Sequence, residues 1–165
     1  MSRREVADVL KAASTSYALK KGYSCFTELG LNSWGKLRAD VLALNLKCHI
    51  LLFEIKSSVQ DYATDTKWRQ YLEYCNKMNF VFTEPVYEKL KDRLKVDLKG
   101  TGVGVLVLCP KTGYLKSVMP SKNRKMEGKT KKNLVVRMAW RNGFSKRDGR
   151  RVRQFIDEES GNQGD

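Results

Sequence analysis

The sequence contains a single histidine, His49, and no pair of cysteines with the CxxC spacing. Its four cysteines are widely separated, at positions 25, 48, 75 and 109. Structural zinc sites take most of their ligands from closely spaced cysteines and histidines, so a zinc-binding module is not expected. Each cysteine lies in or beside an apolar segment, which predicts buried free thiols in a reducing cytoplasm.

Long hydrophobic runs are also missing. No apolar run approaches the roughly 20 residues that a membrane-spanning helix needs. The N-terminus passes into a helical pattern without an apolar leader, and the mean hydropathy is −0.51. We therefore expect a cytoplasmic protein with no membrane partner. With 165 residues, 41% of them hydrophobic, the chain suits one compact domain with a real core.

Acidic residues are scarce in one part of the chain. Residues 111–153 hold 15 lysines and arginines against two acids, and this stretch accounts for most of the net charge of +14. Such a stretch predicts contact with a polyanion, and a solvated tail is the alternative. We expect a folded domain at 1–120, a basic extension that contacts nucleic acid at 121–153, and an acidic disordered tail at 154–165.

Nine cationic residues are the candidates for contact with nucleic acid: Lys67, Lys122, Arg124, Lys125, Lys129, Lys131, Lys132, Arg137 and Arg141. For Lys67, a solvated helix face is the alternative. Trp140 and Phe144 lie among the later cations, where they permit base stacking or anchor a tail helix on the core. No helix-turn-helix, RNA-recognition or zinc-finger signature is present, so base-specific readout is not indicated.

Hydrophobic periodicity predicts an α/β domain with a mixed sheet. We expect a helix at 3–21, strands at 23–31, 37–44 and 49–56, a long helix at about 59–78, and a strand at 79–83. The third strand is apolar on both faces, which is typical of a covered central strand. A short helix from Pro85 to about residue 93, a hairpin at 103–108 and 113–118, and a helix at 133–142 complete the prediction.

Two acids interrupt these apolar strands, Asp40 in the second and Glu54 in the third. A buried charge costs several kcal/mol unless something compensates it. The midpoint of 40 and 54 falls in the connection at 45–48, so a hairpin places the two acids opposite each other, with Cβ atoms about 5 Å apart. Lys56 lies two residues after Glu54 and therefore projects from the same face.

This arrangement points to metal-assisted phosphate chemistry. Opposed carboxylates repel unless a proton or cation lies between them, and such oxygen ligands suit Mg²⁺ or Mn²⁺. A nearby lysine can orient a water or stabilise charge on a phosphate. Glu28 is a further candidate for the catalytic set, because the same midpoint argument pairs it with Asp40, although a one-residue slip moves it to the other face. Glu5 is the second candidate for an extra acid.

Asp40 with Glu54-x-Lys56 resembles the active-site signature of the PD-(D/E)xK nuclease superfamily. A wider set of segments resembles the MmcB-like family of DNA repair proteins: Lys36-Leu-Arg-Ala-Asp40-Val-Leu-Ala-Leu, Phe53-Glu-Ile-Lys-Ser-Ser58, Asp61-Tyr, Asp65-x-Lys67-Trp68, Tyr71, Tyr74-Cys75 and Phe80-Val-Phe. This resemblance covers about residues 20–118 and is most specific across 36–82.

The resemblance implies a restriction-endonuclease-like core, a mixed β-sheet flanked by helices in αβββαβ order. It also implies Mg²⁺-dependent (or Mn²⁺-dependent) hydrolysis of phosphodiester bonds. On that basis Asp40, Glu54 and Ile55 are metal ligands and Lys56 is the catalytic lysine. Ala39 precedes Asp40 where the signature has proline, at a position that varies within the superfamily.

Three classes of function remain open. The first is a metal-dependent nuclease acting on DNA in repair, recombination or genome processing, with RNA as the alternative substrate. The second is a non-catalytic nucleic-acid-binding protein on the same fold, and the third is a protein-interaction modulator. The intact set of Asp40, Glu54 and Lys56 favours the enzyme, because a purely binding fold has little use for a repulsive acid pair. A homodimer is possible where both strands are cut, but no segment identifies an interface.

Overall fold

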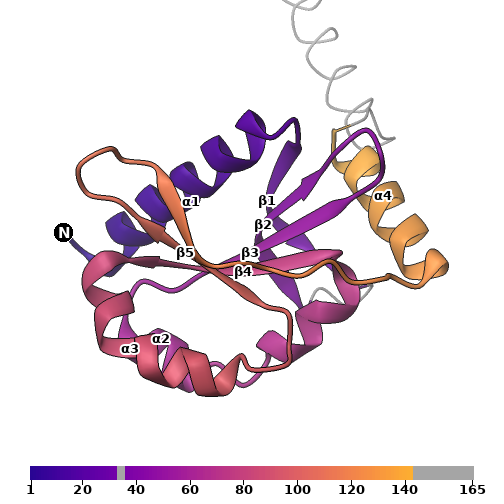
Figure 1. The fold of residues 1–165 in the computed structure, drawn as a ribbon. Coiled ribbons are helices and arrows are strands. Elements are labelled where there is room, and N and C mark those ends of the chain that lie inside the picture. Colours follow the sequence, from indigo (N-terminus) through magenta and orange to yellow (C-terminus); the bar gives the residue numbers. More distant parts are fainter. Residues whose placement is uncertain (33–35, 143–165) are drawn as a thin grey trace, which may run out of the picture. The chain divides into compact units, whose positions relative to one another are not determined.

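The computed structural model describes residues 1–32 and 36–142 (Figure 1). Two compact units are present, Met1–Lys131 and Lys132–Asp165. The first unit contains ten complete elements: α1 (Arg3–Lys20), β1 (Ser24–Gly30), β2 (Arg38–Leu44), β3 (Ile50–Ile55), α2 (Val59–Thr64), the 3₁₀ helix η1 (Trp68–Tyr74), β4 (Lys77–Thr83), α3 (Glu84–Asp97), β5 (Gly104–Leu108) and β6 (Leu115–Met119). Helix α4 (Gly128–Asn142) begins in this unit and continues into the second.

Six strands form one mixed sheet in the order β1-β2-β3-β4-β5-β6. The first three strands are antiparallel, β3, β4 and β5 run parallel, and β6 returns antiparallel to β5. Every residue of β3 is buried, as expected for a central strand with both faces covered. The predicted α/β class, with a mixed sheet flanked by helices, is confirmed, and this architecture is consistent with a restriction-endonuclease-like fold.

Helices cover both faces of the sheet in the first unit (Figure 1). On one face, Leu10 of α1 packs in a core cluster with Phe53 of β3 and Val81 of β4. On the other face, Tyr62 of α2 lies edge-on to Phe80 of β4, with ring centroids 5.4 Å apart. Successive strand residues point to opposite faces, so Glu54, which follows Phe53, projects away from α1.

The predicted long helix at 59–78 is wrong. Helix α2 ends at Thr64, Asp65 has an extended backbone (φ −75°, ψ 110°), and η1 begins only at Trp68. The Asp65 side chain accepts hydrogen bonds from the N–H groups of Lys67 and Trp68, and this local bonding competes with continued helix. The break places Asp65 between two short helices, and not in the first turns of one long helix as predicted.

Other boundaries differ by smaller amounts. Helix α3 extends to Asp97, beyond the expected end near residue 93, and β4 begins two residues early, at Lys77. Helix α4 starts at Gly128, ahead of the predicted 133. Leu134 and Met138 of α4 are buried, while Trp140 is 66% exposed. Phe144 and the predicted acidic tail at 154–165 lie outside the described residues.

The cysteines match the prediction only in part. All four are free thiols, and Cys75 is fully buried. Cys25 and Cys109 are half-buried, whereas Cys48 is exposed, so the prediction of burial is wrong there. Cys48 occupies the tight turn between β2 and β3 with φ 60°, a position outside the sheet's core. In the described part of the chain, no helix has both the length and the apolar character needed to cross a bilayer.

Candidate active site

The hairpin of β2 and β3 sets Asp40 across from Glu54. The antiparallel register pairs Val41 with Phe53, and one further step along both strands brings Asp40 opposite Glu54. Asp40 Oδ2 accepts a 2.8 Å hydrogen bond from the Ile55 N–H, which ties this carboxylate to the end of β3. The hairpin register predicted from the midpoint at residue 47 is therefore confirmed.

The Glu54 carboxylate lies in the interior, with only 6% of the residue exposed. Its Oε1 lies 3.3 Å from Lys56 Nζ. Its Oε2 is buried and has no hydrogen-bond partner among residues 1–32 and 36–142. A buried carboxylate oxygen without a partner costs free energy, because it has lost its hydration and gained nothing in return. A proton or a cation at this oxygen would offset that cost.

Lys56 follows β3 directly and is 4% exposed. Its Nζ lies between two carboxylates, 3.3 Å from Glu54 Oε1 and 2.5 Å from Asp65 Oδ2. The three side chains come from the end of one central strand and from the break between α2 and η1. We call Glu54, Lys56 and Asp65 the charge cluster. It depends on the break between α2 and η1, because that break places Asp65 beside Lys56.

Burial, followed by the Asp40 charge, raises the pKa of Glu54 from 4.5 to about 9. Burial also raises the pKa of Asp40, although the hydrogen bond from Ile55 N–H opposes it. For Lys56, burial lowers the pKa, but Glu54 and Asp65 together outweigh that effect and leave the pKa raised. Lys56 therefore stays charged, and the two acids do not both ionise readily unless a further cation joins them.

An open pocket of about 250 Å³ connects these groups to solvent. Its lining comes from α1, β1, β2, the end of β3 and α2: Ala7, Lys11, Glu28, Asp40, Glu54, Ile55, Lys56 and Asp61. The sequence analysis did not include Lys11 or Asp61 among the candidate site residues. Nothing in the helical pattern around Lys11 singles it out, because its role depends on how α1 crosses the sheet.

Of the two candidates for an extra acid, Glu28 lines the pocket and Glu5 does not. Glu28 lines the pocket, and its carboxylate forms ion pairs with Lys11 (2.9 Å) and Arg38 (3.0 Å). Its backbone has φ 55°, in the left-handed region, so strand alternation alone does not fix its side-chain direction. Glu5 accepts a hydrogen bond from the Ser2 N–H in a capping box of α1 and does not line the pocket. A catalytic role for Glu28 stays a prediction.

The donor set fits Mg²⁺ better than zinc. Within the described residues, no three His, Cys, Asp or Glu side chains lie close enough together to hold an ion by themselves. Mg²⁺ often binds through one or two carboxylates, with waters and substrate oxygens completing its coordination. Asp40 and the unpartnered Glu54 Oε2 match that pattern. Ile55 has a hydrocarbon side chain, so only its main-chain carbonyl oxygen could serve as the predicted ligand.

The predicted nucleic-acid contacts differ in accessibility. Six of the nine are exposed: Lys67, Lys122, Lys125, Lys129, Lys132 and Arg141. Lys131 and Arg137 are half-buried, and so is Arg124. The Arg124 guanidinium donates a 3.1 Å hydrogen bond to the Thr101 carbonyl, so part of its donor capacity serves the fold. Contact of these side chains with nucleic acid stays a prediction.

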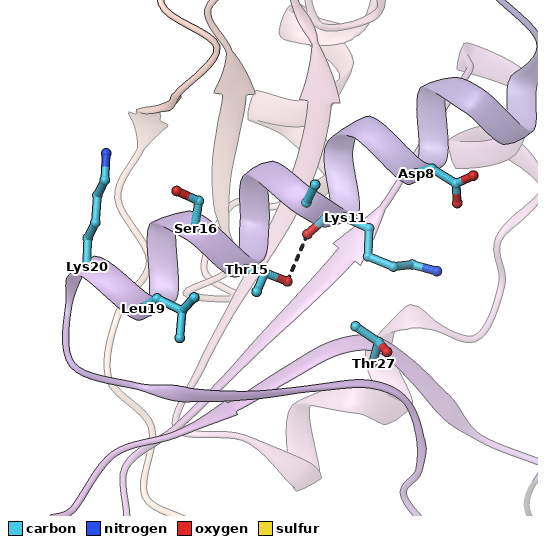
Figure 2. A pocket seen from close by; sticks show the side chains of 8 residues that line it. Asp8, Lys11, Thr15, Ser16, Leu19, Lys20 and Thr27 are labelled. Atoms are coloured by element: carbon cyan, nitrogen blue, oxygen red, sulfur yellow. Dashed lines mark hydrogen bonds between the residues drawn. The ribbon is translucent and has the colours of Figure 1, made fainter.

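A groove lies next to the pocket, and Lys11 lines both. Figure 2 shows Lys11, Thr15 and Leu19 along α1, with Thr27 of β1 beneath them. The groove has a volume of about 530 Å³ and reaches Lys20 at the end of α1. It therefore runs along the α1–β1 side of the sheet, from Asp8 to Lys20 (Figure 2).

Comparison with known proteins agrees with this description. No match is found among curated proteins. A solved structure of a protein of unknown function from Silicibacter pomeroyi has a TM-score of 0.63 at 23% identity, covering 91% of this chain and 90% of the other. That likeness shows the fold. The family model described as "DNA repair protein MmcB-like" matches residues 2–147, which is most of the sequence. The chain therefore belongs to the MmcB-like family.

Proposed function

We propose that this protein is a metal-dependent nuclease of the PD-(D/E)xK type that hydrolyses phosphodiester bonds in DNA during repair, recombination or genome processing. The observation that carries the proposal is the buried, unpartnered Glu54 Oε2. It lies across the hairpin from Asp40 and two residues before Lys56, in an open pocket. A protein that only binds a polyanion gains nothing from two acids at that point.

Each residue has a distinct part in this mechanism. Mg²⁺ or Mn²⁺, when bound, supplies Lewis acidity and a more acidic water. Asp40, Glu54 and the Ile55 carbonyl would hold the ion. Lys56 presents its ammonium to a phosphate oxygen or to the attacking water, where it stabilises charge that develops in the transition state. Its burial strengthens that interaction, because the local dielectric is low.

DNA is the substrate that the family description favours, since the matching model is that of a DNA repair protein. The net charge of +14 supports a polyanionic substrate but does not distinguish DNA from RNA. A nuclease assay on single-stranded, duplex, flap and four-way DNA and on RNA, with Mg²⁺, Mn²⁺ or EDTA, tests both points. Cleavage of DNA that stops in EDTA is the expected result.

Asp40→Ala will weaken both metal binding and cleavage. Removing one of two carboxylate ligands should weaken Mn²⁺ affinity by at least about 10-fold, and cleavage should fall by about 100-fold or more. Calorimetric titration with Mn²⁺ measures the first effect, and single-turnover cleavage measures the second. Asp92→Ala is the matched control, because Asp92 is exposed on α3. If wild type binds DNA without cutting it and Asp40→Ala binds as well or better, the chain is a binding protein.

Three exposed lysines provide a separate test of nucleic-acid contact. Lys122, Lys125 and Lys129 lie in the basic part of the first unit. If each neutralises a phosphate, replacing all three by alanine reduces the slope of log K against log salt by about 2.7 for duplex DNA. Fluorescence anisotropy at several salt concentrations measures this slope.

The control for that triple variant removes the same charge elsewhere. Lys89, Lys95 and Lys99 are exposed in and just after α3, so their replacement by alanine should leave the slope unchanged. Equal losses in both triple variants would show that DNA responds only to net charge. If neither triple variant changes the slope, the basic segment does not contact DNA, and the protein-interaction alternative is favoured.

A further inference from the structure

Asp65 occupies the break between α2 and η1, and its side chain is only 10% exposed. It lines neither the pocket nor the adjoining groove. Lys56, by contrast, reaches the pocket wall, so Asp65 approaches the lysine from the protein side. A buried carboxylate at a chain break, outside the pocket but touching its lysine, needs an explanation beyond the local turn that it forms.

The two oxygens of Asp65 have separate partners. Oδ1 accepts hydrogen bonds from the N–H groups of Lys67 (2.8 Å) and Trp68 (3.1 Å), at the start of η1. Oδ2 accepts the 2.5 Å hydrogen bond from Lys56 Nζ. The local turn at residues 65–68 therefore uses one oxygen only. The second is dedicated to the lysine, and a side chain with a single acceptor cannot serve both.

Asp65 is itself held firmly in place. Trp68, whose N–H it binds, is buried and lies edge-on to Phe80, with ring centroids 5.5 Å apart. Phe80 of β4 pairs in register with Glu54 of β3. The carboxylate is thus connected through packed aromatic rings to the strand that carries the acid. The acceptor that Lys56 binds is therefore fixed in position relative to Glu54.

The Lys56 ammonium needs a fixed hydrogen-bond acceptor to hold its position. A lysine side chain is a flexible four-carbon stem with three rotatable donors, so its ammonium is not placed by its backbone alone. The contact with Glu54 Oε1 is longer, at 3.3 Å, and a cation on the Glu54 carboxylate competes for it. Two of the three ammonium donors meet Glu54 and Asp65, which leaves the third for the pocket.

We infer that Asp65 is a positioning residue for Lys56: it holds the ammonium at the pocket wall while its other oxygen fixes the start of η1. The catalytic part of this inference rests on the proposed nuclease function. The hold on Lys56 does not, and it can be observed in a protein that cleaves nothing.

Asp65→Asn separates the two tasks. The amide oxygen of asparagine still accepts the N–H groups of Lys67 and Trp68, because asparagine and aspartate form the same kind of turn with the following backbone. Its NH₂ group then faces Lys56 Nζ with a donor, so the lysine loses its acceptor. Asp65→Ala removes both contacts. Asp92→Asn makes the same chemical change on the exposed side of α3 and is the control.

The first readout is the side-chain ¹H–¹⁵N signal of the Lys56 ammonium, assigned by its disappearance in Lys56→Arg. In wild type, a buried and hydrogen-bonded ammonium exchanges slowly enough with water to be seen. Asp65→Asn should lose or strongly shift this signal, while its melting temperature stays within a few degrees of wild type. Asp65→Ala should lose the signal and also melt lower, and Asp92→Asn should match wild type in both.

The second readout is cleavage. Asp65→Asn should lower kcat by about 10- to 100-fold, as for other groups that orient a catalytic residue, with KM and Mn²⁺ affinity unchanged. An unchanged Lys56 signal in Asp65→Asn overturns the inference, and so does a normal kcat in an active enzyme. If wild type cleaves no substrate, the nuclease proposal fails, and the ammonium signal alone still decides whether Asp65 holds Lys56.

Discussion

Glu54→Gln will cleave at least about 1,000-fold more slowly than wild type, a loss of about 4 kcal/mol in transition-state stabilisation. Glutamine keeps the volume of the side chain but removes the negative charge that holds the cation. It also presents an NH₂ group toward either Asp40 or Lys56, the groups on each side of Glu54. The effect should fall mainly on the chemical step, and single-turnover cleavage in Mg²⁺ and in Mn²⁺ measures it.

Glu73→Gln is the matched control for that variant. Glu73 is exposed on η1 and lines neither the pocket nor the groove, so its replacement should leave the rate unchanged. A Glu54→Gln protein that keeps more than about a tenth of the wild-type rate would rule out the Asp40–Glu54 pair as the metal site. Loss of cleavage with unchanged Mn²⁺ affinity would instead assign Glu54 a role other than ligation.

The same substitution will make the metal-free fold more stable, and increasingly so as the pH rises. Burial and the Asp40 charge raise the pKa of Glu54 from 4.5 to about 9. Between these values the folded chain holds a proton that the unfolded chain has released, so folding becomes less favourable as the pH increases. The stability associated with the protonated carboxyl is fully present below pH 4.5 and is lost as the pH rises through 9.

Glutamine has no proton to release, so the variant escapes this loss. Near pH 5 the two proteins should melt at similar temperatures. At pH 8 the variant should be more stable by on the order of 3 kcal/mol, or about 6–12 °C for a chain of this size. Thermal unfolding in EDTA across pH 5–9 measures the gap, and Glu73→Gln should show none. Saturating Mg²⁺ should narrow the gap by stabilising wild type alone. A gap that does not change with pH would mean that Glu54 is ionised in the folded protein.

The β2–β3 hairpin and its two acids could be predicted because both depend on local chain geometry. Asp40 and Glu54 are charged residues in apolar strands, and a short connection between them fixes the register. The break at Asp65 could not be predicted in the same way. Trp68, Tyr71, Leu72 and Cys75 recur at helical spacing, and η1 buries Trp68, so this pattern favours a helix without showing where it begins. The side-chain bonds of Asp65 to the Lys67 and Trp68 N–H groups lie at this break, and helical periodicity does not reveal them.

Residues that reach the site from other elements were also beyond prediction. Lys11 meets Glu28 across a sequence separation of 17 residues, and that contact depends on how α1 crosses the sheet. The left-handed backbone at Glu28 is equally invisible, because glutamate rarely adopts it and no glycine or asparagine marks the position. The basic residues, in contrast, were recognisable from composition, but Arg124 shows that a cation in a basic run also serves the fold.

The attachment of Arg124 has a thermodynamic consequence for its neighbours. Its N–H binds the Asn76 carbonyl at 2.7 Å, and its own carbonyl accepts a bond from the Asn76 side chain. The Lys122 N–H binds the Gly102 carbonyl, and Asn123 meets His49 at 2.7 Å. The backbone at 122–124 is therefore ordered when the chain folds. A polyanion that meets Lys122 or Lys125 loses little affinity to ordering that backbone, so association there should show the small heat-capacity change of two rigid surfaces meeting.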